Sequence, residues 1–256
     1  MKNKPLIVIT AILVLVLFIA LILTPLYKRF PAKKVSVVKG RIAIVLDDWG
    51  YHLNNLAIAK EIKVPLTCAI LPNLKNSGLA AKELNNSGFE IILHLPMEPK
   101  EKYRLEKNTI TSSMDAGQVR DILNRGLASV IFAKGVNNHM GSRITEDRKI
   151  SAIVMAETKK RKLYFLDSFV TAKSVCRQIA AKIRVRFARR DVFLDNQDDP
   201  LYIKEQLMKL KNLAGRQRNV IAIGHDRKNT LTVLREMLPM MEREGYKFVF
   251  VSEIAK

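Results

Sequence analysis

The sequence is poor in several features that often reveal a protein's class. Its 256 residues include two cysteines, Cys68 and Cys176, which excludes a disulfide framework and a multi-cysteine zinc module and leaves room for one bridge at most. No Gly-x-Gly-x-x-Gly or Walker loop is present, so nucleotide binding has no sequence support. There is no internal repeat, and 48% of the residues are hydrophobic, the level of an ordinary globular protein.

Acidic residues are missing from the first 41 positions, which hold eight Lys and Arg. Removing these eight from the 44 basic residues leaves 36 against 24 acidic ones, so residues 42 to 256 keep a net charge of +12. Such a surplus suits an anionic partner, whether nucleic acid, a membrane surface or an acidic envelope polymer. The basic residues are nevertheless scattered, Lys159 to Lys162 being the only tight run, and no aromatic residues are interleaved. The pattern favours a solvated basic face and argues against nucleic acid as a partner.

An uncharged apolar run of 18 residues, Leu6 to Leu23, lies between Lys2 and Lys4 on one side and Lys28 and Arg29 on the other. At about 1.5 Å rise per residue, a helix of this length approaches the roughly 30 Å hydrocarbon core of a bilayer. A cleaved signal peptide is the alternative, but the run is long for one and no small-residue cleavage site follows. We therefore expect a short basic N-terminus (1–5), a single-pass transmembrane helix (6–23), a basic linker (24–40) and a globular domain (41–256). Charge alone does not fix the orientation.

From Arg41 onward, short Val-, Ile- and Leu-rich runs alternate with longer amphipathic stretches. Seven or eight short strands that are apolar throughout predict an α/β fold with a parallel sheet covered on both faces. An incomplete or distorted (β/α) barrel accounts for this number of strands in one domain, and an open doubly wound sheet is the competing fold. The expected strands are Ile42–Leu46, Leu66–Leu71, Phe89–Leu93, Gly135–Asn137, Leu163–Leu166, Val192–Leu194, Val220–Ile223 and Phe248–Val251. The expected helices are Asn54–Ile62, Ser77–Asn86, Asp115–Phe132, Asp147–Lys160, Ser174–Ile183, Pro200–Leu213 and Thr230–Glu244.

Polar residues follow these strands repeatedly, at the edge where active sites of parallel α/β folds collect. A single Asp or Asn there is usually a helix cap or turn residue, and a single His is more often structural than a ligand. Six strand ends with two adjacent carboxylates and three of the four histidines nevertheless make a joint pattern, which suits Zn²⁺ or a similar divalent ion. His52 lies in a loop and keeps a structural interpretation. The polar residues concerned are Asp47, Asp48, His94, Asn138, His139, Asp167, Asp195 and His225.

Asp47 and Asp48 are neighbours and can serve different roles. Successive residues of an extended segment point to opposite sides, so one carboxylate can bind metal while the other faces substrate as a base. Glu98 is a further possible ligand, four residues after His94 in a segment whose two prolines make it a loop.

Taken in order, these motifs resemble the divergent polysaccharide deacetylases, distant relatives of metal-dependent carbohydrate esterases. The resemblance covers Arg41 to Glu253 and is carried by LDD, HLPMEP, GVNNHMGS, FLDS, FLDNQDDP and IGHD. It implies an incomplete (β/α) barrel, a divalent metal, zinc above all, and an acetylated envelope polysaccharide or peptidoglycan-type glycan as substrate.

The resemblance also implies roles for individual residues. Asp47 matches the general base, Asp48 and His94 match metal ligands, and His225 matches the general acid. Glu98 stands where a second metal histidine is expected, so His139 could complete the metal shell in its place or together with it.

The arginine motif that orients the base in the family is replaced by Asn-Asn-His-Met-Gly. We expect Asn138, Asp167 and Asp195 to be auxiliary or substrate-binding residues. The function expected is hydrolysis of acetyl groups by a membrane-anchored, extracytoplasmic domain. The alternative is an inactive envelope protein that keeps the barrel and binds glycan or a protein partner.

Overall fold

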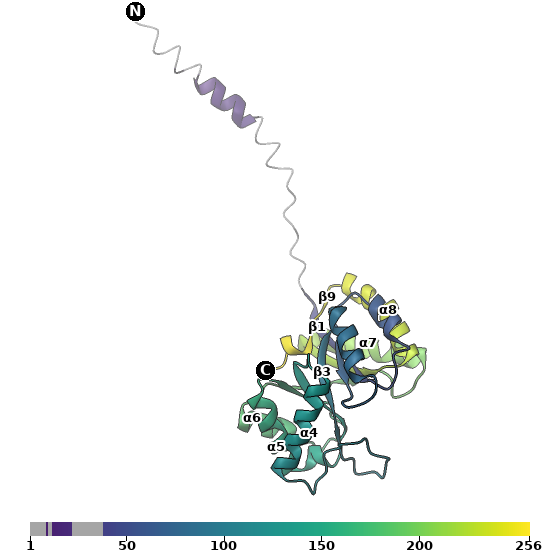
Figure 1. Ribbon diagram of the computed structural model, residues 1–256. Coiled ribbons are helices and arrows are strands. Elements are labelled where there is room, and N and C mark those ends of the chain that lie inside the picture. Colours follow the sequence, from purple (N-terminus) through teal and green to yellow (C-terminus); the bar gives the residue numbers. More distant parts are fainter. Residues whose placement is uncertain (1–8, 10–11, 22–37) are drawn as a thin grey trace, which may run out of the picture. The chain divides into compact units, whose positions relative to one another are not determined.

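The computed structural model describes residue 9, residues 12–21 and residues 38–256 (Figure 1). Residues 12–21 are helical, whereas the rest of the expected membrane segment, apart from residue 9, and residues 24–37 of the expected linker lie outside the described residues. Among the residues that are described, no helix is long and apolar enough to cross a membrane. The chain divides into two units, Met1–Val37 and Val38–Lys256, and the second is the expected globular domain.

A single parallel sheet forms the centre of this domain. Its strands run in the order β6-β5-β4-β3-β2-β1-β8-β7, and β9 also pairs with the start of β1. The strands are β1 (Gly40–Trp49), β2 (Thr67–Ile70), β3 (Glu90–Met97), β4 (Gly135–Met140), β5 (Tyr164–Asp167), β6 (Phe187–Arg189), β7 (Val192–Phe193), β8 (Asn219–His225) and β9 (Tyr246–Phe248).

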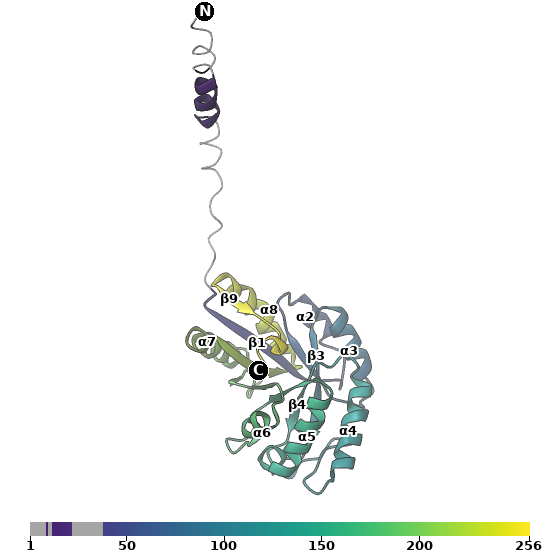
Figure 2. The ribbon, with the colours of Figure 1, turned by 90° about the vertical axis from the view of Figure 1, so that its left-hand side faces the viewer.

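Seven helices surround the strands in the residues from 38 onward (Figure 2). Three of them begin at an aspartate whose side chain accepts backbone N–H groups of the first turn: Asp115, Asp147 and Asp199, which satisfies donors that have no partner within the helix. The helices are α2 (Leu56–Glu61), α3 (Ser77–Asn86), α4 (Ala116–Ser129), α5 (Arg148–Lys160), α6 (Cys176–Ile183), α7 (Pro200–Gln217) and α8 (Lys228–Arg243).

The sheet curls until its two ends are joined by one extended segment, residues 187–193. Its first half, β6, pairs with β5, and its second half, β7, pairs with β8. The change of partner falls between two residues: Arg190 N–H donates to Asp167 O at 3.0 Å, whereas Asp191 N–H donates to Ile221 O at 2.8 Å. The domain is therefore a distorted (β/α) barrel, not an open doubly wound sheet.

Alternation along each strand separates two hydrophobic cores. On β1, Ile42, Ile44 and Leu46 belong to the larger core, together with the apolar sides of the helices. Ala43 and Val45 belong to the smaller core, with residues such as Ile92, Leu166 and Ile223 from other strands. Since successive side chains of a strand point to opposite faces, the smaller core fills the barrel interior. Along the inner face of the barrel, the residues are therefore apolar at the start of each strand and polar at its carboxyl end.

The observed elements differ from the expected ones at three places. β3 continues to Met97, so the first four residues of the segment from His94, expected to be a loop, are a strand that pairs with β4. β6 was not predicted, because its three residues, Phe187–Arg189, lie among arginines and carry no apolar alternation. The last expected strand, Phe248–Val251, is correct only at its start. β9 ends at Phe248 and the chain turns into a 3-10 helix at Val251–Glu253, where Phe250 N–H donates to Glu253 Oε1 at 3.0 Å. Val249 and Val251 are apolar because they belong to the smaller core, not because they extend the strand.

Candidate metal centre and active site

The carboxyl ends of four strands bring the polar residues together. Asp47 on β1 is paired in register with His225 on β8, and His94 on β3 is paired with Asn137 on β4. Each continues the alternation of the inner face: Asp47 follows Val45, His94 follows Ile92, and His225 follows Ile223. The mouth of the barrel is thus lined by one carboxylate and the imidazoles as a direct consequence of strand register.

Asp48 reaches this site because β1 is irregular at that residue. The register with β2 shifts between Leu46 and Trp49, and Asp48 has a φ of 67°, a left-handed conformation that Asp tolerates better than most residues. The expectation that alternation would send Asp47 and Asp48 to opposite sides was therefore wrong. Both carboxylates lie near one imidazole, with Asp48 Oδ1 at 3.1 Å and Asp47 Oδ2 at 3.7 Å from His94 Nε2.

Three ligand atoms form a triangle beside this imidazole. Asp48 Oδ1, His94 Nε2 and His139 Nδ1 are separated by 3.1 Å along each of its three sides. Ligands held at about 2.0–2.1 Å around a four-coordinate zinc ion lie roughly 3.3 Å apart. The spacing of the three atoms therefore fits a small divalent cation.

Hydrogen bonding sets the protonation of His94 in this triangle. Its Nδ1 lies 2.8 Å from Asn137 Oδ1, and the Asn137 Nδ2 group donates to Asp47 Oδ1 at 2.9 Å. Because an amide oxygen only accepts hydrogen bonds, His94 Nδ1 must carry the proton, and neutral His94 presents its Nε2 lone pair to the triangle. An imidazole lone pair, the carboxylate of Asp48 and a nitrogen of His139 thus face one another, an arrangement that a cation stabilises.

Without an ion, the charges around His94 favour a second proton, on Nε2, at the position that a cation would take. Burial opposes a positive charge there, but attraction by Asp47 and Asp48 is stronger and raises the pKa of His94 to about 9. For Asp48, burial is likewise outweighed by hydrogen bonds from His139 and His94, which hold its pKa well below the ordinary value. The pocket thus favours positive charge at the centre of the triangle.

His225 is held by an aspartate on the side away from the site. Asp195, fully buried, lies with Oδ1 2.7 Å from His225 Nδ1, and its Oδ2 accepts from His225 N–H and from Thr230 Oγ1. This assigns the Nδ1 proton to the Asp195 bond and leaves Nε2 as the other ring nitrogen. Burial lowers the pKa of His225, but the bond and attraction to Asp195 outweigh it and raise the pKa above its ordinary value.

An aromatic side chain lies against His225, and a cationic side chain lies against that aromatic ring. The ring of Phe193 stacks on the imidazole at 6.1 Å with an interplanar angle of 18°. The guanidinium of Arg190 lies 3.7 Å from the centre of the Phe193 ring and donates to the carbonyl oxygens of Ser168 and Phe169, both at 2.7 Å.

Three of the predicted site residues form hydrogen bonds with loop residues instead of with the triangle. Glu98 accepts two hydrogen bonds from Ser112 and pairs with Arg143 Nε at 3.1 Å. Asn138 donates to Met140 O and accepts from Ser168 N–H. Asp167 accepts from Phe169 N–H and Ser174 Oγ, so all three order loops around the barrel mouth.

Asn137 is the site residue that sequence reasoning missed, and alternation could have found it. Val136 belongs to the core between sheet and helices, so Asn138 shares its face, while Asn137 and His139 share the inner one. Fully buried, Asn137 bonds both the base candidate and a metal-ligand candidate.

Comparison with known proteins identifies the relatives of this chain. The model of the family described as divergent polysaccharide deacetylase matches residues 44–255. The uncharacterised protein YibQ of Escherichia coli is 35% identical over 202 residues, which are 79% of this chain and 63% of that protein. An uncharacterised protein of Haemophilus influenzae is 34% identical over 212 residues, covering 83% of this chain and 74% of the relative. The chain therefore spans less than two thirds of the Escherichia coli protein.

Solved structures share the fold. An uncharacterised protein of Agrobacterium tumefaciens has a TM-score of 0.80 at 24% identity, over 88% of this chain and 92% of that one. The family 4 carbohydrate esterase domain of a xylanase from the hindgut metagenome of Trinervitermes trinervoides has a TM-score of 0.55 at 13% identity, over 84% and 88% of the two chains. At these identities the likeness concerns the fold alone.

Proposed function

The chain belongs to the divergent polysaccharide deacetylase family, and on that premise we propose that it is a metal-dependent hydrolase that removes acetyl groups from an envelope polysaccharide. The observation that carries the proposal is the 3.1 Å triangle of Asp48, His94 and His139, next to the pair formed by Asp47 and His225 across neighbouring strands. Asp48, His94 and His139 would hold the divalent ion, and zinc suits a set of two imidazoles and one carboxylate.

A bound ion supplies a Lewis acid that polarises the acetyl carbonyl and lowers the pKa of water. The protein's own residues move the protons. Asp47, oriented by the Asn137 amide, accepts a proton from the attacking water. The carbon–nitrogen bond of the acetamide then breaks, and His225 gives the leaving amine its proton from Nε2 while Asp195 holds Nδ1. The products are acetate and a free amino sugar.

The raised pKa of His225 suits this role, because it extends the protonated form, which a general acid requires, to higher pH. Burial also raises the pKa of Asp47, against the attraction of His94 and His225. A positive charge in the triangle would favour the ionised form of this carboxyl, which is the form a base requires.

We propose further that the protein is anchored by residues 6–23 with its domain outside the cytoplasm. The length and apolar character of that run support an anchor, and a glycan substrate of the envelope supports the orientation.

The experiment measures metal content and acetate release for residues 38–256, incubated with chitooligosaccharides and with peptidoglycan fragments. His225→Asn should retain metal and thermal stability while acetate release falls at least about 10²-fold, the lower end for a lost acid catalyst. His52→Asn is the matched control, since this histidine pairs with Asp226 in a loop and should leave the rate unchanged.

An unchanged rate in His225→Asn would overturn the assignment of the acid. If the wild-type domain binds metal and an acetylated glycan but releases no acetate, the glycan-binding alternative replaces the enzyme.

A further inference from the structure

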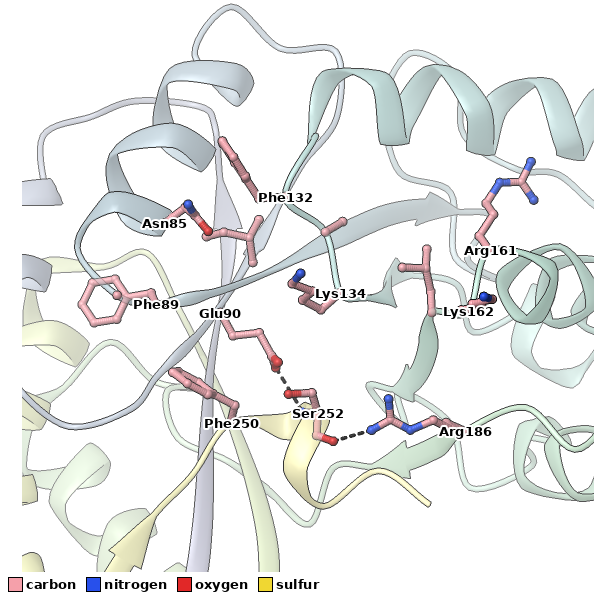
Figure 3. A pocket seen from close by; sticks show the side chains of 14 residues that line it. Asn85, Phe89, Glu90, Phe132, Lys134, Arg161, Lys162, Arg186, Phe250 and Ser252 are labelled. Atoms are coloured by element: carbon pink, nitrogen blue, oxygen red, sulfur yellow. Dashed lines mark hydrogen bonds between the residues drawn. The ribbon is translucent and has the colours of Figure 1, made fainter.

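A cavity of about 660 Å³ opens at the edge of the sheet opposite the metal residues (Figure 3). It is lined by residues that precede β3, β4, β5 and β6, among them Phe89, Lys134, Lys162 and Arg186. His94 follows the start of β3 by four residues, so the cavity and the triangle are separated by roughly 13 Å of strand. The cavity is thus independent of the proposed active site.

Positive charge in this cavity is largely unneutralised. Among the described residues, the ammonium groups of Lys134 and Lys162 have no hydrogen-bond or ion-pair partner, and Arg186 donates only to the carbonyl oxygens of Ser252 and Ala255. Arg161, also in the lining, differs because Glu157 pairs with it at 2.8 Å. Three cations therefore remain available to a ligand.

Glu90, the acidic residue of the cavity lining, does not neutralise these cations at the surface. Glu90 is 8% exposed, and its Oε1 accepts hydrogen bonds from Tyr164 OH, Thr67 Oγ1 and Ser252 N–H. These bonds engage one carboxylate oxygen inside the domain. An incoming anion would meet the cations at the rim, and the half-buried Phe132 and Phe250 line the same cavity (Figure 3).

The surrounding edge is basic as well. Arg186 also lines a neighbouring cavity of about 530 Å³ with Arg177 and Arg184, neither of which forms an ion pair within the described part of the chain. β1 begins at this edge with Gly40, so the chain enters the domain here. The residues before Gly40 include seven basic side chains and an 18-residue apolar run.

We propose that the cavity binds the phosphate of an anionic phospholipid, so that this edge of the barrel docks on an anionic bilayer. Lys and Arg donate charge-assisted hydrogen bonds to phosphate oxygens, and the phenylalanine rings suit the apolar boundary below the headgroups. A bilayer is favoured over a free anion because the basic residues continue beyond the cavity along the edge where the chain enters. The carboxyl edge, with Asp48 and the histidines, then faces away from the lipid.

The test uses residues 38–256, which contain both hydrophobic cores, and measures co-sedimentation with two kinds of vesicle. One is phosphatidylcholine alone, and in the other about a third of the lipid is phosphatidylglycerol. We expect binding to the anionic vesicles that weakens with added salt. The combined variant Lys134→Gln, Lys162→Gln and Arg186→Gln should lower the partition coefficient at least about 10-fold.

A matched control removes the same charge from the opposite edge. Lys75, Lys149 and Lys228 are exposed, lie near the starts of α3, α5 and α8, and have no side-chain partner among the described residues. Their combined change to Gln should alter the partition coefficient by less than about 2-fold. If both variants lose vesicle binding equally, net charge alone would explain the binding. That result would overturn the proposal that the cavity binds the phosphate.

Two further arms identify the source of the phosphate. Inorganic phosphate and a soluble polyphosphate are titrated into the wild-type domain and the cavity variant. Binding of either one that depends on the cavity residues, without binding to anionic vesicles, would overturn the membrane proposal in favour of a free anion or a polymer. Vesicle binding lost in the cavity variant, with an unaltered melting temperature, supports it.

Discussion

The replacement Asn137→Leu tests how the site prepares its metal ligand. Leucine keeps the approximate size of asparagine but removes both the oxygen that holds His94 Nδ1 and the amide group that holds Asp47 Oδ1. His94 is then free to place its proton on either ring nitrogen and to rotate. We expect metal affinity to fall about 10–100-fold, the usual loss when a residue behind a metal histidine is removed.

The same change should also lower stability. Asn137 is fully buried, and His94 and Asp47 each lose a hydrogen bond in a place without solvent. A buried polar group left unsatisfied costs about 1–3 kcal/mol, and more when it is charged, so the variant should lose about 2–6 kcal/mol. Loss of affinity must therefore be separated from loss of folding.

Thr67→Val provides that separation. Thr67 is fully buried, and its hydroxyl bonds Glu90 and Val251 N–H at the far end of the barrel. Its replacement should destabilise the domain without changing metal affinity. Zinc is titrated against a chromophoric chelator at a temperature where both variants are folded by circular dichroism. Losing the hydrogen bond that orients His94 should lower zinc affinity at least about 10-fold. A zinc affinity of Asn137→Leu within about 3-fold of wild type would therefore refute the reasoning.

Further predictions concern the same domain and its anchor. His139→Ala should abolish stoichiometric metal binding whereas Glu98→Gln keeps it, as measured by metal analysis, and the reverse result would make Glu98 the ligand. Asp195→Asn removes the carboxylate that raises the pKa of His225, so the alkaline limb of the rate against pH should move to lower pH. A limb that does not move would show that another group limits the rate. The full chain should keep its N-terminus and fractionate with membranes, and a mature N-terminus after Leu23 would contradict the anchor.

Strand order along the chain predicted the barrel and the edge at which the site would form, because short apolar runs between amphipathic stretches leave few alternatives. The same pattern predicted that Asp48, His94 and His139 would lie near one another. It did not predict their mutual geometry, because that depends on the irregularity at Asp48, whose left-handed φ leaves no trace in residue type. Glu98 and His139, the two candidates for the third ligand, differ in their surroundings, because loop contacts engage Glu98, and residue type does not predict such contacts.

The way the barrel closes makes one part of its rim more compliant than the rest. β1 and β8 pair over seven positions, whereas between residues 187 and 193 the ring depends on β6 and β7, which have three and two residues. Segments with few hydrogen bonds open most readily, so the amides of Arg190 and Asp191 should exchange with deuterium before those of β1. Asp47, His94 and His225 all lie on the arc from β8 through β1 to β4, outside this segment. Opening between residues 187 and 193 would thus leave the hydrogen bonds among β8, β1, β2, β3 and β4 in place.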